Sequence, residues 1–263
     1  MNPRLQLRRY ANRENRKLKA YERKYAKAIY AILNSQLDEA IRNVQYGALF
    51  ADVGMFDLLS EMYKEVGVDI ANDQYDALTS FNTKASNFFL NNWLDFMTNY
   101  ILTNMGRRVT GINDTTRKKI QETIAIGNNL GLTTEKMALF LRQRIGTFNR
   151  YRSTMIARTE IAEAANIAKE KSSEDWEQET GENLYKMWIH RYTKAPRHWH
   201  EDLDNGKAIP KPEKFIVTNP NTGTTVQMDR PHDPAGGAEN SINCSCVVVF
   251  VSESYARRIN SQK

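Results

Sequence analysis

The sequence predicts an α+β protein with a long-helix N-terminal α-helical body and a small C-terminal α+β module with short antiparallel strands. No Pro or Gly occurs between Arg4 and Val44, which permits one uninterrupted helix. Six of the seven prolines, all four histidines and both cysteines follow Gly181. These shifts predict a basic long helix or arm at 1–48, a helical body at 49–180 and a small β-rich module at 181–263.

Apolar spacing predicts the helices of the first two segments. Between Leu18 and Ile41, apolar residues recur every three or four positions, as on one face of a helix. We expect Gly106 and Gly146 to end two of the helices, because glycine is common just after a helix C-terminus. The expected helices span residues 4–44, 55–66, 73–105, 114–124, 133–146 and 150–179.

Three runs after Gly181 carry β-type residues: NLYKMWIHRY, EKFIVTNPNTGTTVQMD and CSCVVVF. The Asn, Pro and Gly content of NPNTG predicts a hairpin turn within the second run. The valines of the third run are typical of a buried strand, so we expect Cys244 and Cys246 to share one face of it.

Positive charge is concentrated at the N-terminus. The whole chain carries +6, whereas the first thirty residues contain ten basic and two acidic side chains, a difference of +8. A nucleic acid or an acidic protein surface is the natural partner of such a segment, although a charged run can also serve only to keep a helix soluble. The ten basic residues are Arg4, Arg8, Arg9, Arg13, Arg16, Lys17, Lys19, Arg23, Lys24 and Lys27. Deletion of residues 1–30 is expected to leave the C-terminal module folded.

The remaining composition favours a globular protein made in a cytoplasm. No apolar run has the eighteen or so residues that a membrane span needs, and the N-terminus lacks the apolar centre of a secretory signal. We therefore expect no membrane partner. Two cysteines one residue apart cannot supply a disulfide framework, so they are interpreted as free thiols or metal ligands.

Every strong metal-binding side chain except the carboxylates lies in the module. Two thiolates and two imidazoles, from Cys244, Cys246, His200 and His232, would complete a tetrahedral zinc shell, so the cofactor is either none or a structural zinc ion. Familiar structural sites, however, space their cysteines by two to four residues and supply them from a tight turn. The alternative is that the thiols pack as small hydrophobes on a buried strand, where burial would raise the thiol pKa and make them inert.

The motifs of several enzyme classes are absent. The spacing of HWHED and CSC fails the zinc-deaminase pattern, and the sequence contains no H-E-x-x-H, G-x-S-x-G or Walker-type glycine loop. We therefore expect a protein without enzymatic activity. The alternative is a metal-dependent hydrolase or transferase of the toxin type that uses the cluster of His200, Asp204, Asp233, Cys244 and Cys246.

Arg158 and Glu160 in the segment ARTE have two interpretations. They could form an ordinary surface pair, or they could tie the last long helix to the module by charge and hydrogen bonds. Residues i and i+2 do not face each other on a helix, so the two side chains must serve different neighbours.

Four blocks occur in an order that resembles the signature of the phage Mu protein F-like minor head proteins, the phage head morphogenesis family. The blocks are IARTEIAEAANIAKEK, KMWIHRY, PRHWHEDLDNG and RPHDPAGGAENSINCSC, and together they cover about residues 156–250. In that family an Arg-Thr-Glu helix precedes R-x-x-H-x-x-L-D-G, a G-D-P turn and an N-C-x-C strand. The matching positions here are His200, Asp204, Gly206, Asp233, Pro234, Glu239, Asn243, Cys244 and Cys246. Asn205 is an extra residue, His232 replaces the usual glycine, and Ser245 replaces the common arginine.

The resemblance implies a minor structural protein of a tailed-phage head, located in the virion near the portal vertex or inner capsid. It would act in head morphogenesis and in DNA packaging or ejection. Its partners would be the portal protein, the major capsid protein or both, and packaged double-stranded DNA could contact the basic helix. The compact module would serve as an anchor whose loops are fixed by polar residues, namely Arg158, Glu160, His200, Asp204, Asp233, Glu239 and Asn243.

Overall fold

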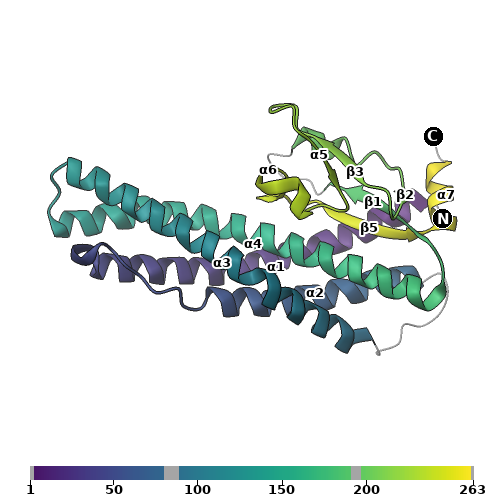
Figure 1. Cartoon of the computed structure of the whole chain (residues 1–263), viewed down its shortest axis with the longest axis horizontal. Coiled ribbons are helices and arrows are strands. Elements are labelled where there is room, and N and C mark those ends of the chain that lie inside the picture. Colours follow the sequence, from purple (N-terminus) through teal and green to yellow (C-terminus); the bar gives the residue numbers. More distant parts are fainter. Residues whose placement is uncertain (1–2, 80–88, 191–196, 262–263) are drawn as a thin grey trace. The chain divides into compact units, whose positions relative to one another are not determined.

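The computed structural model describes residues 3–79, 89–190 and 197–261 (Figure 1). Long helices make up the described chain as far as Thr180. None of the helices in these described ranges is long and apolar enough to cross a membrane. The helices are α1 (Pro3–Arg42), the short 3-10 turn η1 (Val44–Tyr46), α2 (Met55–Thr79), α3 (Phe89–Asn129) and α4 (Thr134–Thr180).

The C-terminal segment forms a small antiparallel sheet with short helices around it. Strand β1 is central, and the sheet order is β2-β1-β5. Strands β3 and β4 pair separately as a hairpin in which Phe215 lies opposite Met228. The elements are β1 (Leu184–Ile189), α5 (His198–Glu201), β2 (Ile209–Pro210), β3 (Phe215–Thr218), β4 (Thr225–Met228), η2 (Pro234–Gly236), α6 (Gly237–Ser241), β5 (Val247–Ser252) and α7 (Glu253–Asn260). The predicted fold class and the predicted hairpin are confirmed.

The glycine breaks expected at Gly106 and Gly146 are wrong, because both residues lie inside continuous helices, α3 and α4. Glycine in a helix interior costs only about 1 kcal/mol, and buried neighbours such as Met105 and Ile145 offset that cost by packing. Part of the helix expected at 73–105 falls on residues 80–88, outside the described ranges; α2 and α3 flank it.

The strand expected to carry both cysteines begins later than predicted. Strand β5 starts at Val247, and Cys244 and Cys246 lie in the turn that connects α6 to β5. Asn243, which has a positive φ of 61°, turns the chain just before the first cysteine. Asparagine tolerates this left-handed conformation better than most residues. The two cysteines thus lie in the short connection that follows this turn rather than on a strand face.

The chain divides into two compact units, to each of which all four long helices contribute residues. The first unit comprises Met1–Tyr21, Tyr63–Met97 and Arg158–Lys263, and the second comprises Glu22–Met62 and Thr98–Ala157. This division does not follow the sequence boundaries at residues 48 and 180. The physical reason is that the helices are long enough to pack with different neighbours along their length.

In the first unit, the N-terminal end of α1 is part of the core. Leu7 packs in a cluster with Val249 and Val251 of β5 and with Tyr255 and Ile259 of α7. Farther along α1, the buried Glu14 accepts a 2.6 Å hydrogen bond from Nζ of the buried Lys169 in α4. The structure therefore contradicts the expectation that residues 1–30 form a removable arm.

The free edge of β5 is bonded by side chains from two helices of the first unit. Asn166 of α4 donates to the carbonyl of Cys246 at 3.1 Å and accepts from the amide of Val248 at 2.8 Å. Gln74 of α2 donates to the carbonyl of Phe250 at 3.0 Å and accepts from its amide at 3.3 Å. Lys169 donates to the carbonyl of Val248 at 2.9 Å. These buried side chains satisfy backbone groups that would otherwise require another strand.

The second unit has its own core, made by the remaining parts of α1, α3 and α4. Leu37 and Ala40 of α1 cluster with Ile120 of α3 and Leu141 of α4. Arg152 donates to Thr116 Oγ1 and to the Ile112 carbonyl. Burial lowers the pKa of the Arg152 guanidinium to about 10.

Candidate functional site

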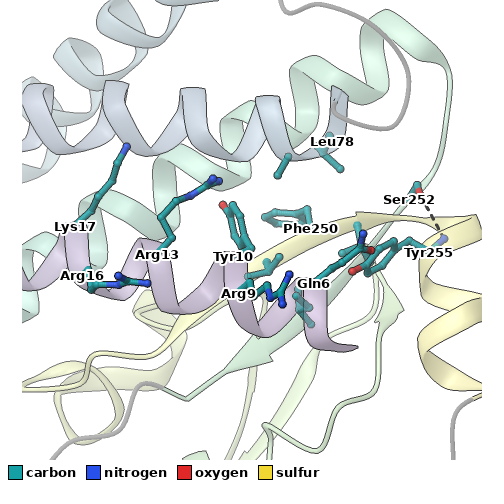
Figure 2. A pocket seen from close by; sticks show the side chains of 14 residues that line it. Gln6, Arg9, Tyr10, Arg13, Arg16, Lys17, Leu78, Phe250, Ser252 and Tyr255 are labelled. Atoms are coloured by element: carbon teal, nitrogen blue, oxygen red, sulfur yellow. Dashed lines mark hydrogen bonds between the residues drawn. The ribbon is translucent and has the colours of Figure 1, made fainter. Parts of the chain in front are cut away.

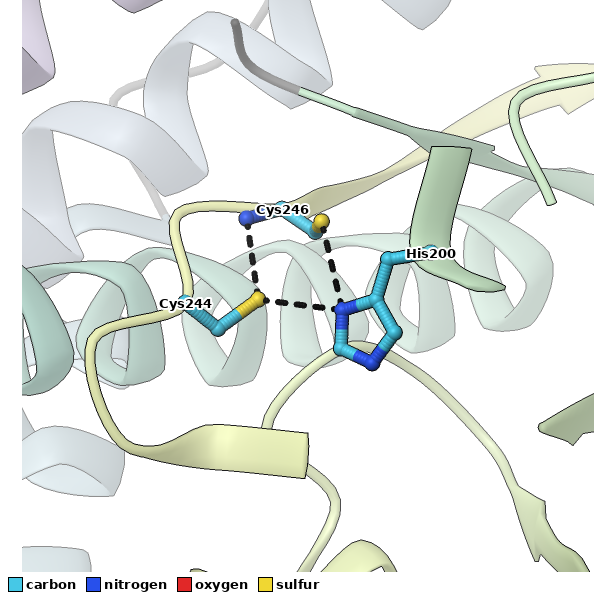
Figure 3. Close-up of side chains that lie close together, drawn as sticks. All are labelled: His200, Cys244 and Cys246. Carbon is cyan, nitrogen blue, oxygen red and sulfur yellow. Dashed lines mark hydrogen bonds between the residues drawn. The ribbon is translucent and has the colours of Figure 1, made fainter. Parts of the chain in front are cut away.

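His200, Cys244 and Cys246 converge in the first unit (Figure 3). Nδ1 of His200 lies 3.5 Å from Sγ of Cys244 and 3.7 Å from Sγ of Cys246. The backbone N–H of Cys246 also points at Sγ of Cys244, at 3.4 Å. The three residues are only 1%, 4% and 2% exposed. The cluster is therefore a closed, buried group of one imidazole and two thiols.

The hydrogen bonds around His200 fix which ring nitrogen carries the proton. Asn240 Oδ1 lies 3.1 Å from His200 Nε2 and also accepts from the indole N–H of Trp199 at 3.0 Å. The indole N–H can only donate, so the atom of Asn240 that faces both rings is its oxygen. His200 Nε2 must then be the donor to it. In the neutral imidazole the lone pair of Nδ1 consequently faces the two sulfurs.

The pKa of the Cys244 thiol lies well below its ordinary value of 9.0. The hydrogen bond with Cys246 lowers it most, burial raises it, and the imidazoles of His200 and His232 lower it further. The sequence expectation of a raised thiol pKa is thus wrong for Cys244. Neighbouring hydrogen bonds and imidazoles outweigh desolvation there.

His232 is the fourth predicted metal ligand. It lies in the loop after β4 with a φ of 63°, and its side chain is fully buried. Neither of its ring nitrogens has a hydrogen-bond partner in the described ranges, and Nδ1 lies 3.9 Å from Oε2 of the buried Glu163. Burying an imidazole without a hydrogen bond costs desolvation free energy, so we expect the His232 ring to bind a further group.

The residues expected to form one polar cluster hold several parts of the module. Arg158 of α4 donates to Asn243 Oδ1 at 2.7 Å, in the turn before the cysteines. Glu160 accepts from the Tyr63 hydroxyl at 2.7 Å, so these two side chains do serve different neighbours. The remaining three each bond a different loop: Asp204 accepts from the amide of His190, Asp233 from the amides of Asp229 and Ala235, and Glu239 from Asn219.

The predicted basic residues lie on α1, and all those with described side chains are exposed except the half-buried Lys17. The side chain of Arg4 is outside the described residues. Lys17 forms ion pairs with Asp69 at 2.9 Å and Asp73 at 2.7 Å, so its charge is already matched. Arg8 lines a hollow of the first unit together with His190 and Asp204. Arg23, Lys24 and Lys27 belong to the second unit.

Four of the basic residues border a groove of about 730 Å³ in the first unit (Figure 2). Its apolar surface comes from Leu7 of α1, Leu78 near the end of α2 and Phe250 of β5, with Tyr255 of α7 closing one end. The basic residues at the groove are Arg9, Arg13, Arg16 and Lys17. An apolar groove bordered by cations is suited to a segment that is partly apolar and partly acidic.

Sequence reasoning missed the residues that orient these features. Asn240 fixes His200, and Asn166 and Gln74 hold the β5 edge, yet asparagine and glutamine are ordinary in loops and on helices. The only signal for Asn166 was its position on the buried stripe of α4, among small apolar residues such as Ala162 and Ala165.

A model of the family described as Phage Mu protein F like protein matches residues 118–249, which is half of the chain. The match reaches from the C-terminal part of α3 through α4 to β5, so it includes His200, Cys244 and Cys246. No curated protein and no solved structure matches the chain.

Proposed function

The chain belongs to the phage Mu protein F-like family, and we propose from this membership that it is a minor structural protein of a tailed-phage head. The family match over residues 118–249 is the observation that carries the proposal, because it suggests phage head morphogenesis. In this proposal the protein resides in the virion at the portal vertex or inner capsid. It acts there in head assembly and in DNA packaging or ejection.

A structural rather than an enzymatic role is supported by the burial of the Cys/His cluster. A thiol nucleophile or a catalytic metal needs an open position for its substrate. Cys244 and Cys246 are instead enclosed by their neighbours, and His200 is packed against Trp188 and Trp199 with ring centroids 5.2 and 5.9 Å apart. The cluster is therefore better suited to hold loops together than to turn over a substrate.

The groove along α1 supports a protein partner for this face, and we assign it to an acidic segment of the portal protein. A duplex would contact only the cations, since phosphates gain nothing from the apolar floor formed by Leu78 and Phe250. A segment with carboxylates and apolar side chains would use both.

The test compares two double charge reversals on the same helix. Arg9→Glu with Arg13→Glu changes the groove, whereas Arg8→Glu with Lys19→Glu makes the same charge change at exposed residues that do not line it. Each variant is co-expressed with the portal protein of the same phage, and co-purification and incorporation into heads are measured. We expect the groove variant to lose at least tenfold in portal binding and the control variant to retain it.

Two other outcomes decide against parts of the proposal. Equal losses in both variants, with a steep salt dependence of binding to a DNA duplex, would assign the helix to phosphate contacts instead. A wild-type chain that is absent from purified heads would overturn the structural role itself.

A further inference from the structure

We propose that His200, His232, Cys244 and Cys246 bind one structural zinc ion that joins three segments of the first unit. His200 comes from α5, His232 from the loop after β4, and the two cysteines from the turn before β5. This inference does not depend on the role in the phage head.

The distances within the cluster agree with tetrahedral coordination. With Zn–S near 2.3 Å and Zn–N near 2.0–2.1 Å, a tetrahedral angle places a sulfur and a nitrogen ligand about 3.6 Å apart. The two sulfur-to-Nδ1 distances are 3.5 and 3.7 Å. The three ligand atoms all lie within 4.8 Å of one another. Each ligand atom could therefore reach a common centre with only small side-chain adjustments.

Both sulfurs approach Nδ1 of His200, but the single lone pair of that nitrogen can accept an S–H bond from only one of them. Without metal, the other thiol is left with the weaker hydrogen bond between the two cysteines. A shared cation removes this conflict, because two thiolates and the nitrogen lone pair all donate to it. The backbone N–H of Cys246, which points at Sγ of Cys244, also stabilises a thiolate more than a neutral thiol.

The surroundings resemble those of metal-bound imidazoles. Metal-ligating histidines normally donate their other ring N–H to an amide, carbonyl or carboxylate oxygen. His200 does this through Asn240, whose amide is itself held by a 2.9 Å bond from Nδ2 to the Gly236 carbonyl. His232 is outside the group of ligand atoms that lie within 4.8 Å of one another, so its ring must shift toward the sulfurs for Nε2 to complete the shell; Glu163, 3.9 Å from Nδ1, is placed to orient it.

The chemistry of the donor set selects zinc among common metals. Two thiolates and two imidazoles in a closed shell match structural zinc sites, whereas calcium and magnesium require oxygen ligands. A bound metal is also expected to stabilise this module strongly, because β2, β3 and β4 are only two to four residues long and loops make up much of the module.

The first measurement is the metal content of the untagged full-length protein by inductively coupled plasma mass spectrometry. We expect about one zinc per chain in the wild type and at least a tenfold loss in Cys244→Ser, Cys246→Ser and His200→Asn. His198→Asn is the matched control, because His198 lies on the same short helix and is exposed; it should keep the zinc. His232→Ala should weaken zinc binding more than Asn240→Ala, for which about 10–100-fold is expected.

A second measurement keeps the proposal testable if the ligand variants do not fold. Cobalt(II) is titrated into wild-type protein from which zinc has been removed, and the visible and near-ultraviolet bands of tetrahedral thiolate coordination are recorded. We expect both bands at one equivalent. Protein that is purified without zinc and gives no cobalt bands would overturn the site, and so would a Cys244–Cys246 disulfide in the metal-free chain. Zinc retained by all ligand variants would place the metal elsewhere.

Discussion

Asn166 provides a sharp test of how β5 is held in the first unit. Replacing it with leucine keeps a side chain of similar size but removes the amide that bonds the carbonyl of Cys246 and the N–H of Val248. Both backbone groups would then be buried without partners, at about 1–3 kcal/mol each. The better helix propensity of leucine returns about 0.5 kcal/mol. The expected loss in unfolding free energy is therefore about 2–5 kcal/mol.

The assay is guanidinium unfolding followed by tryptophan fluorescence. All four tryptophans, Trp93, Trp176, Trp188 and Trp199, belong to the first unit, so their emission reports that unit. Asn72→Leu is the matched control, because Asn72 is a half-buried helical asparagine that bonds the Val68 carbonyl of its own helix. It should change the unfolding free energy by no more than about 0.5 kcal/mol.

The comparison of the two leucine variants shows whether the side-chain hydrogen bonds to β5 stabilise the first unit. If Asn166→Leu shifts the unfolding midpoint no more than Asn72→Leu, the side-chain bonds to β5 do not stabilise the unit and the reasoning is refuted. Gln74→Leu, which removes the equivalent pair of bonds at Phe250, should behave like Asn166→Leu.

Three further predictions use the same fluorescence assay. Lys169→Met should lower the free energy of unfolding by about 3–5 kcal/mol, because it leaves the Glu14 carboxylate buried without its cation. Adding Glu14→Leu should recover most of this loss. A double variant that recovers nothing would argue against a stabilising ion pair. Leu7→Ala should cost about 2–3 kcal/mol, whereas a detachable arm predicts no change. Burial lowers the pKa of Lys186 below its ordinary 10.5, so the unfolded chain keeps this proton at pH values where the folded chain has lost it. The stability of the wild type should accordingly rise relative to Lys186→Met as pH increases through the lowered pKa to 10.5, and parallel stability curves would contradict the shift.

Much of the fold could be predicted from local patterns. The apolar stripe after Leu18 identified α1, the NPNTG segment identified the turn between β3 and β4, and the order of four motif blocks identified the family. Helix ends were predicted less well, because Gly106 and Gly146 are weak local breakers that packing along α3 and α4 overrides.

The candidate site was predicted only as a set of residue types. The sequence alone supplied two cysteines and the histidines that could join them, but it placed the cysteines on a strand and treated the spacing as an argument against zinc. In the structure the cysteines lie in the connection before β5, beside His200, which is 44 and 46 residues away in sequence.

By itself, the sequence determined the helical body, the antiparallel module and the family, since periodicity, turn residues and motif order are properties of neighbouring positions. Only the tertiary structure decided that the basic N-terminus is part of a core, that Asn166 and Gln74 bond β5, and that Asn240 orients His200. The physical reason is that a hydrogen bond between residues 40 or more positions apart leaves no periodic trace in either segment; its partners become identifiable only when the fold brings them together and excludes water.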